Sequence, residues 1–274
     1  MAHPSLDPIA YDGFDLPSLN QALSGTRFEH KLHFFSSISS TNTHAMHQAE
    51  AGASDGSVWL ADEQTQGRGR GAHAWSSPPG SGLYCSILLR PAIAPADILW
   101  LSLAAGLAAR NAVRQVTSLE ADLRWPNDLL LGSRKFCGIL TELNAEVTRV
   151  RHAVIGIGIN VHQAHFPDEL RSLATSLLIE TDREWPRQEI LLALLQSLDR
   201  EIATLTTSSD PRQFAHTMRE RLSAASSWIR GKHVRVEENG GFTGITEGLD
   251  ARGFLQVRSA GALRTVYSGG VREA

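Results

Sequence analysis

The sequence predicts an α+β protein with one large mixed domain followed by a small β domain. Short apolar runs typical of strands fill the first part of the chain. Two amphipathic helices follow, the first opened by Pro186 and the second by Asp210-Pro211. From Trp228 onward, short strand-like runs are separated by turn residues in a regular meander. We therefore divide the chain into residues 1–226 and 227–274, and expect the second part to be a small β-barrel packed on the first.

The larger domain is expected to contain several strands. Val58 and Leu60 alternate toward one face, whereas residues 83–89 form a continuous apolar run that suits a central strand. Gly132-Ser133 reads as part of a tight turn between two later strands. The expected strands are residues 31–38, 57–62, 83–89, 122–125, 129–131, 136–144 and 151–161.

Helices are expected to accompany these strands. The helix with the clearest pattern starts at Asp97, which we expect to be its N-cap, and runs to about Val116. Leu101, Ala105 and Ala112 fall on one face of it, and their small size predicts tight packing on a sheet. The other expected helices cover residues 16–23, 43–51, 186–205 and 211–225.

The composition is that of an ordinary globular enzyme. Of the 274 residues, 42% are hydrophobic and 20% are charged. The net charge of -3 lacks the basic character of general nucleic-acid-binding proteins. The N-terminus has no signal-peptide pattern, and the most apolar windows are too short to span a membrane. With only Cys85 and Cys137, we expect no disulfide scaffold and a reducing, cytoplasmic location.

The most distinctive stretch lies between the expected strands 57–62 and 83–89. Three glycines alternate there with two arginines, in the order Gly67, Arg68, Gly69, Arg70 and Gly71. Glycine can adopt positive φ and bring N–H groups close to a ligand, while a guanidinium pairs with phosphate or carboxylate oxygens. Such a loop suits a polyanion and is expected to become ordered when that ligand binds. On composition alone, a flexible surface loop and a weak single-stranded nucleic-acid contact remain open beside a small-molecule site.

Several common catalytic motifs are absent from the sequence. It contains no G-x-x-x-x-G-K-[ST] phosphate loop and no G-x-S-x-G nucleophile elbow. The glycines at 156 and 158 lie inside a strand-like run, whereas a dinucleotide-binding motif opens a helix. His44 and His47 lack an evident third metal ligand. Cys137, although near Lys135, reads as a small buried residue rather than a reactive thiol.

What remains is a set of polar side chains at strand ends and turns. Each has a structural explanation by itself, such as capping a turn or ending a strand. Together they supply amide and hydroxyl groups for a neutral polar ligand, three cations for phosphate and one carboxylate for a metal. The set consists of Ser40, Thr41, Asn42, Gln64, Arg68, Arg70, Asn127, Asp128, Lys135 and Asn160.

With this set the sequence resembles biotin protein ligases, the enzymes that attach biotin to a carrier protein. Five motifs occur in the family's order between about residues 35 and 162. They are Ser40-Thr41-Asn42; Gln64 with Gly67-Arg68-Gly69-Arg70 and Trp75; Arg124-Trp125-Pro126-Asn127-Asp128; Arg134-Lys135 through Gly138-Ile139-Leu140 to Glu142; and Gly156-Ile157-Gly158-Ile159-Asn160.

The resemblance implies a catalytic domain like that of class II aminoacyl-tRNA synthetases, a mixed sheet flanked by helices, with a C-terminal SH3-like barrel. It implies that biotin's carboxylate attacks the α-phosphate of ATP to give biotinyl-5′-AMP, and that a lysine of a biotin carboxyl carrier protein then accepts the biotinyl group. Because two anions must meet in the first step, cations have to hold them together. Mg²⁺ would neutralise the pyrophosphate leaving group.

The resemblance also implies roles for individual residues. The catalytic set would be Lys135, Arg70, Arg68 and Asp128, with Lys135 nearest the biotin carboxylate and the α-phosphate. Biotin would be bound by Ser40, Thr41, Asn42, Gln64, Gly67, Arg68, Trp75, Lys135 and Gly138. The adenylate would be bound by Arg70, Trp75, Asn127, Lys135, Gly158 and Asn160. Two alternatives stay open for Asp128, which would either help the phosphates to hold Mg²⁺ or orient the incoming amine.

The chain departs from the family's pattern at two positions of the loop. Ala72 and His73 stand where the family commonly has a glycine and a third arginine, so the loop carries one permanent cation fewer. The chain is also too short for the N-terminal DNA-binding domain of bifunctional relatives, and neither DNA binding nor a repressor function is expected. A homodimer through sheet edges is implied by the resemblance alone.

Two other functions remain open from the sequence. A lipoate or octanoyl transfer enzyme would share the fold, but the arginine-rich loop and Trp125-Pro126-Asn127-Asp128 favour biotin. A non-catalytic regulator that binds biotin or a nucleotide would not need Lys135 or both loop arginines. The sequence therefore predicts an active biotin protein ligase.

Overall fold

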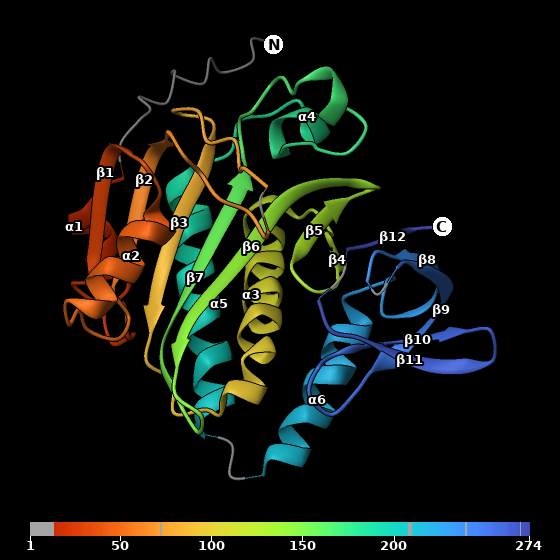
Figure 1. The fold of residues 1–274 in the computed structure, drawn as a ribbon. Helices are drawn as coiled ribbons and strands as arrows, with labels where there is room; N and C mark the ends of the chain where they lie inside the picture. Colours follow the sequence, from red (N-terminus) through yellow and green to blue (C-terminus); the bar gives the residue numbers. More distant parts are fainter. Residues whose placement is uncertain (1–13, 72, 208–209, 239, 269) are drawn as a thin grey trace.

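The computed structural model describes residues 14–71, 73–207, 210–238, 240–268 and 270–274. A seven-stranded sheet forms the centre of its larger part (Figure 1). The strand order is β1-β2-β3-β7-β6-β5-β4, with β1 and β2 parallel and all other neighbours antiparallel. The strands are β1 (Leu32–Ile38), β2 (Val58–Gln64), β3 (Gly82–Leu89), β4 (Asp122–Arg124), β5 (Asp128–Leu131), β6 (Arg134–Ala145) and β7 (Val150–Asn160).

Helices cover both faces of this sheet. On one face α3 and α5 lie behind the strands in the view of Figure 1, and their apolar side chains form the main core with the sheet. On the other face α2 packs around a smaller core that includes Ala45, Trp59 and Leu88. The helices are α1 (Leu16–Ala22), α2 (Thr41–Glu50), α3 (Leu99–Thr117), α4 (Leu177–Thr181), α5 (Arg187–Thr207) and α6 (Pro211–Ala224).

The alternation of side chains along β3 separates the apolar core from the polar side of the sheet. Cys85 and Ile87 join the main core, whereas Leu88 packs with α2 and Ser86 contacts side chains of α2. Ser86 lies opposite Gly156 of β7 in the strand register. Gly156 gives the Asn42 side chain its space on this face, because a Cβ there would lie 2.1 Å from Asn42 Oδ1.

A second sheet of five antiparallel strands lies beside the first, coloured blue in Figure 1. Its order is β11-β10-β9-β8-β12. The buried side chain of Trp125 connects the two parts, since its Nε1 donates to Gly253 O at 2.9 Å. The strands are β8 (Arg230–Val236), β9 (Phe242–Leu249), β10 (Leu255–Ser259), β11 (Ala262–Val266) and β12 (Val271–Glu273).

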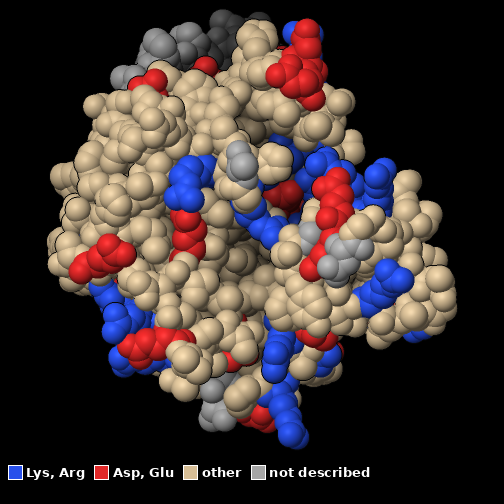
Figure 2. Space-filling model, viewed as in Figure 1, with Lys and Arg blue, Asp and Glu red and all other residues tan. Residues whose placement is uncertain are grey.

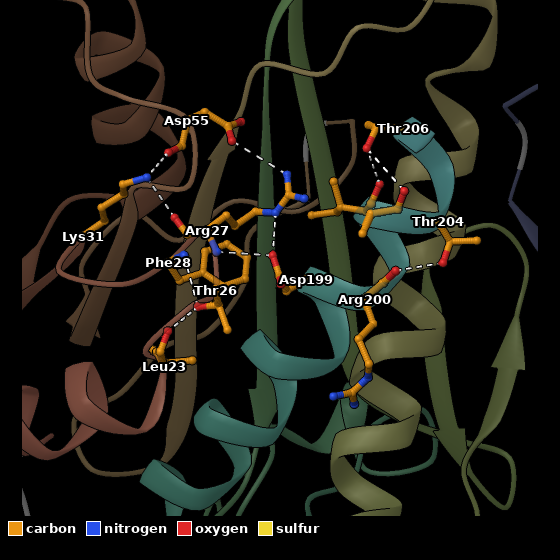
Figure 3. Close-up of polar contacts among 12 residues, drawn as sticks. Leu23, Thr26, Arg27, Phe28, Lys31, Asp55, Asp199, Arg200, Thr204 and Thr206 are labelled. Atoms are coloured by element: carbon orange, nitrogen blue, oxygen red, sulfur yellow. Dashed lines mark hydrogen bonds and ion pairs between the residues drawn. The ribbon is translucent and has the colours of Figure 1, made fainter. Parts of the chain in front are cut away.

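A group of ion pairs and hydrogen bonds fixes the segment before β1 against α5 (Figure 3). Arg27 Nε lies 2.7 Å from Asp199 Oδ1 of α5, and Arg27 NH1 lies 3.7 Å from Asp55 Oδ2. Lys31 Nζ donates to the carbonyl oxygens of Arg27 and Asp55, at 2.9 Å each. The edge of the sheet that carries β1 and β2 is thereby tied to the helical layer.

The predicted mixed sheet with flanking helices and the small C-terminal β structure are confirmed. The expected N-cap at Asp97 is wrong, because Pro95–Asp97 forms a 3₁₀ turn and α3 begins only after Ile98. The turn begins at Pro95, two residues before Asp97, so Asp97 is its last residue rather than a cap. The predicted start of α6 is confirmed, with Asp210 accepting from the backbone nitrogens of Arg212 and Gln213. Within the described ranges, no helix has the length and apolar character needed to cross a bilayer.

Candidate active site

The Gly/Arg stretch forms a hairpin between β2 and β3. Trp75 N donates to Gly67 O at 2.9 Å, and Gly69 N donates to His73 O at 2.8 Å. The two sides approach so closely that a Cβ on Gly67 would lie 2.3 Å from Trp75 O. Positive φ was expected to explain these glycines, but of the three in the stretch only Gly71 adopts it, with φ 65°. Gly67 is needed for space rather than for its backbone angles.

Beneath the hairpin lies a cavity of about 40 Å³, which we call the inner cavity. Its floor lacks side chains where Gly138 of β6 lies opposite Gly158 of β7. The indole ring of Trp75 covers this floor. A Cβ on Gly158 would lie 2.5 Å from Trp75 Nε1, and one on Gly138 would lie 2.9 Å from Trp75 Cζ3. Glycine is therefore required at both positions for the ring to lie there.

Lys135 and Asp128 form the central charged pair of the site. Lys135 Nζ lies 2.6 Å from Asp128 Oδ1, and Arg124 NH2 lies 2.7 Å from Asp128 Oδ2. Burial opposes ionisation of Asp128, but the charges of Lys135 and Arg124 outweigh it and hold the pKa of this carboxyl below its usual value. Asp128 is thus an ionised carboxylate that fixes two cations, one from β4 and one from β6.

Arg70 connects the hairpin to two other parts of the molecule. Its NH1 donates to Asn127 Oδ1 at 3.1 Å, and its NH2 donates to Ser268 O of the C-terminal part at 2.8 Å. Burial lowers the pKa of Arg70, and the nearby Asp128 opposes this shift. The guanidinium still keeps its charge. Because it is partly removed from water, it attracts an anion more strongly than a fully solvated arginine would.

Gln64 holds the start of α2 against the returning side of the hairpin. Gln64 Oε1 accepts from Thr41 N at 2.9 Å and from Thr41 Oγ1 at 3.0 Å. Gln64 Nε2 donates to Ser77 Oγ at 2.9 Å. Ser40 caps α2 by accepting from Thr43 N at 3.4 Å. The predicted hydroxyl and amide groups are thus part of one connected arrangement.

Ser86 and Glu142 complete this arrangement, although the sequence predicts no role for either. Ser86 Oγ lies 2.8 Å from Thr41 Oγ1 and donates to Asn42 Oδ1 at 2.6 Å. Asn42 Nδ2 donates to Glu142 Oε2 at 2.9 Å, and Arg68 NH2 lies 2.9 Å from Glu142 Oε1. A serine inside an apolar strand is a usable sequence signal, since a buried hydroxyl needs a partner. Glu142 ends one of the five sequence motifs, but its role could not be read from the sequence, because its partners Asn42 and Arg68 come from α2 and the hairpin.

A larger cavity of about 700 Å³, the outer cavity, lies between the hairpin and the C-terminal part. Figure 2 shows the hollow between these parts, with Lys and Arg side chains around it. Phe166 and Leu170 contribute apolar surface, and Arg272 contributes a cation from β12. The outer and inner cavities share Gly69, Arg70, Trp75, Asn127 and Lys135.

Most of the predicted site residues lie around the inner cavity. They are Ser40, Thr41, Asn42, Gln64, Arg68, Arg70, Trp75, Asn127, Lys135, Gly138 and Gly158. Asp128 and Asn160 line the outer cavity instead, and Asn160 Nδ2 donates to Thr175 O at 3.0 Å. Gly67 lines neither cavity. His73 is exposed and lines the outer cavity, whereas Ala72 lies outside the described residues.

His44 and the two cysteines take part in packing rather than in a metal site. Among the residues that the structure describes, no group of three His, Cys, Asp or Glu side chains could hold a metal ion. His44 packs against the rings of Phe35 and Trp59, with centroids 5.1 and 5.9 Å away. Both cysteines are buried as free thiols, and burial raises the pKa of Cys85 to about 12 and that of Cys137 further.

Comparisons with known proteins cover both parts of the chain. Residues 34–160 match the Biotin/lipoate A/B protein ligase family, and residues 230–271 match the Biotin protein ligase C terminal domain. The biotin--[acetyl-CoA-carboxylase] ligase of Mycobacterium tuberculosis is 35% identical over 239 residues, which cover 85% of each chain. The bifunctional ligase/repressor BirA of Bacillus subtilis is 34% identical over 234 residues, which cover 84% of this chain and 70% of that protein.

A solved structure extends the similarity to three dimensions. Biotin protein ligase from Aquifex aeolicus, in complex with biotin and ATP, superposes with a TM-score of 0.77 at 29% identity. The superposition covers 89% of this chain and 100% of that one. It confirms the class II aminoacyl-tRNA synthetase-like catalytic fold with its C-terminal SH3-like part. By its sequence, its fold and the two matched domains, the chain belongs to the biotin protein ligase family.

Proposed function

We propose that the inner cavity binds biotin, that the outer cavity binds ATP, and that biotinyl-5′-AMP forms where the two meet. The observation that carries this assignment is the set of residues common to both cavities, above all Lys135 and Arg70. As a biotin protein ligase, the chain makes biotinyl-5′-AMP from biotin and ATP. It then transfers the biotinyl group to a lysine of a biotin carboxyl carrier protein.

The two cations at the junction suit the first step. The biotin carboxylate and the α-phosphate are both negative, so Lys135 and Arg70 would hold them together and stabilise the charge that develops on the phosphate. Asp128 keeps Lys135 Nζ in place at 2.6 Å. Since both Asp128 oxygens are paired with cations, we assign it a positioning role rather than that of a base.

Biotin binding requires Trp75 to move. The inner cavity holds about 40 Å³, whereas small-molecule sites usually hold roughly 300 Å³ or more. Trp75 Nε1 is buried without a hydrogen-bond partner, so displacing the ring breaks no hydrogen bond of the indole, although it separates the ring from the Lys135 ammonium. Its displacement would open the floor at Gly138 and Gly158 to the ligand. That the loop becomes ordered when ligand binds stays a prediction.

We propose that magnesium arrives with ATP and is held by phosphate oxygens. Mg²⁺ keeps several waters and commonly uses substrate phosphates with one or two carboxylates. We do not assign Asp128 as one of those carboxylates, because the charges of Lys135 and Arg124 already neutralise it at 2.6 and 2.7 Å and would repel a metal ion. No other carboxylate cluster in the described part of the chain offers a site.

A third cavity, of about 410 Å³, offers an approach for the carrier lysine, and we call it the side cavity. It lies between the start of α3, β6 and the C-terminal part, and it shares Arg70 and Asn127 with the other two cavities. Leu143, Tyr267 and Arg252 line it, and none of its lining residues is a carboxylate. Apolar walls and two guanidinium groups disfavour an ammonium, so a lysine entering here would lose its proton more readily, as an attacking amine must.

Tyr267→Asp tests this approach. Tyr267 is 61% exposed and packs on Phe254, with ring centroids 5.1 Å apart. A carboxylate there would hold the incoming ammonium and remove an apolar contact, so transfer to the carrier should slow about tenfold. Pyrophosphate release should stay within about twofold, since Tyr267 lines neither the inner nor the outer cavity. Leu263→Asp is the matched control, because Leu263 is 51% exposed on β11 outside the cavity. Equal transfer rates in both variants would remove the side cavity from the carrier's path.

One assay tests the proposed function as a whole. The purified protein is incubated with ATP, Mg²⁺, a biotin carrier domain and either biotin or lipoate, and the carrier is weighed by mass spectrometry. We expect one added biotinyl group with biotin, none with lipoate, and none when EDTA removes the metal. Absence of the biotinyl adduct, or efficient addition of lipoate, would overturn the assignment.

A homodimer through sheet edges is also part of the proposal. β6 pairs with β5 only as far as Gly138, yet it continues to Ala145. Its outer edge beyond that point has no strand partner among the described residues. Open edges of this kind accept a strand from a second chain. Light scattering should give twice the chain mass at high concentration, and a single-chain mass throughout would contradict the dimer.

We further place the protein in the cytoplasm. Its two cysteines are buried free thiols rather than a disulfide, as is usual in a reducing compartment. Cell fractionation followed by immunodetection should find the protein in the cytoplasmic fraction.

A further inference from the structure

We infer that Glu142 is a positioning residue, which orients the hydroxyl groups of the inner cavity so that Thr41 presents an acceptor to a ligand N–H. This inference rests on the proposed function, because biotin's cyclic urea supplies the N–H groups that such an acceptor would bind. Glu142 ends one of the five sequence motifs, but neither that motif nor the reaction assigns it a role. The inference is carried by a continuous line of hydrogen bonds that ends on the Glu142 carboxylate.

The line runs across the face of the sheet that carries α2. Glu142 Oε2 accepts from Asn42 Nδ2 at 2.9 Å. Asn42 Oδ1 accepts from Ser86 Oγ at 2.6 Å, and Ser86 Oγ lies 2.8 Å from Thr41 Oγ1. Ser86, Thr41 and Asn42 are exposed by 0%, 3% and 4% respectively. Because water cannot reach these groups freely, their protons have to be shared within the line itself.

Ser86 has one hydroxyl proton and two neighbouring acceptors. The Asn42 carbonyl oxygen is the better acceptor. Because Asn42 Nδ2 donates to the Glu142 carboxylate, the amide is polarised and Asn42 Oδ1 becomes more negative. The shorter contact agrees, at 2.6 Å to Asn42 Oδ1 against 2.8 Å to Thr41 Oγ1. The Thr41 proton has its own acceptor in Gln64 Oε1 at 3.0 Å. The lone pairs of Thr41 Oγ1 are therefore left for an N–H group in the inner cavity.

Glu142 also fixes the hairpin above that cavity. Its Oε1 lies 2.9 Å from Arg68 NH2, and its Oε2 accepts from Arg68 NH1 at 3.3 Å. One carboxylate thus orients both the Thr41 acceptor of the inner cavity and Arg68 of the hairpin. A neutral side chain of the same shape would accept from Asn42, but it would bind Arg68 weakly and polarise the line less.

The test is the affinity for biotin without ATP, measured by isothermal titration calorimetry. Glu142→Gln should weaken biotin binding about tenfold, as expected for a hydrogen bond that loses its charge. Asp199→Asn is the matched control: Asp199 is 24% exposed, as Glu142 is, and pairs with Arg27 at 2.7 Å on α5 (Figure 3). Its affinity for biotin should stay within about twofold of wild type. With biotin methylated on the ureido nitrogens, wild type and Glu142→Gln should bind equally.

A double-mutant cycle with Ser86→Ala shows whether Glu142 acts through the line. If it does, Glu142→Gln should have a clearly smaller effect on biotin affinity in the Ser86→Ala background than in wild type. Equal affinities of wild type and Glu142→Gln, or independent effects of the two substitutions, would overturn the inference. Absence of biotin binding by the wild-type protein would instead overturn the proposed function on which it rests.

Discussion

Lys135→Ala is expected to slow biotinyl-adenylate formation about 10²- to 10³-fold, the usual cost of removing one group that stabilises transition-state charge. Lys135 Nζ lies where the inner and outer cavities meet, and Asp128 holds it there at 2.6 Å. Without the ammonium, the carboxylate of biotin meets the α-phosphate with one neutralising charge fewer. Release of pyrophosphate in a single turnover measures the loss. Biotin affinity in the absence of ATP should change far less, because the proposed contacts to the urea lie at Thr41 rather than at Lys135.

Lys232→Ala provides a closely matched control for this variant. Lys232 is 27% exposed, as Lys135 is, and it pairs with Glu273 at 2.7 Å. Both ammonium groups also lie over a tryptophan ring, 5.1 Å from the Trp228 centroid and 5.2 Å from the Trp75 centroid. Since Lys232 lies in the C-terminal sheet, its replacement should leave pyrophosphate release within about twofold. A normal rate for Lys135→Ala would remove Lys135 from the catalytic set.

The order and type of the main elements could be predicted from the sequence because their periodicity is strong. The continuous apolar run in β3 and the small residues of α3 both follow from burial. The start of α3 could not be placed, since an aspartate after Pro95 resembles a cap although it belongs to a 3₁₀ turn. Sequence patterns specify faces of elements well and their ends poorly.

The cations of the candidate site could be predicted because they stand in distinctive sequence patterns. The two arginines alternate with glycines, and Lys135 lies in one of the five motifs. The supporting groups of the site could not be predicted, because they depend on strand register. Gly138 and Gly158 meet only when β6 and β7 pair, and the ring of Trp75 then needs the space. Asp128 reads in the sequence as a candidate metal ligand. Its ion pair with Arg124 forms only when β4 and β5 pair as a hairpin.

Arg70→Ala is expected to make the enzyme release biotinyl-5′-AMP faster. Arg70 NH2 donates to Ser268 O and its NH1 to Asn127 Oδ1, so this side chain ties the hairpin to the C-terminal part beside the junction of the cavities. Without Arg70, biotinyl-5′-AMP would lose a cation for its phosphate, and the hairpin would no longer be tied to the C-terminal part over it. Dissociation of the adenylate should rise about 10- to 100-fold, the effect of one charged hydrogen bond. Rapid dilution of enzyme loaded with labelled adenylate measures that rate.

The escaping acyl-adenylate reacts with any exposed amine, which gives Arg70→Ala a second signature. Biotinylation of serum albumin lysines should increase, whereas Lys135→Ala should decrease it because little adenylate forms. Arg70→Lys should fall between wild type and Arg70→Ala, since an ammonium restores the charge but not two directed bonds to Asn127 and Ser268. Adenylate dissociation at the wild-type rate in Arg70→Ala would contradict this role. Opposite effects of the two alanine variants on albumin would instead show that Lys135 acts mainly in forming the intermediate, whereas Arg70 also retains it.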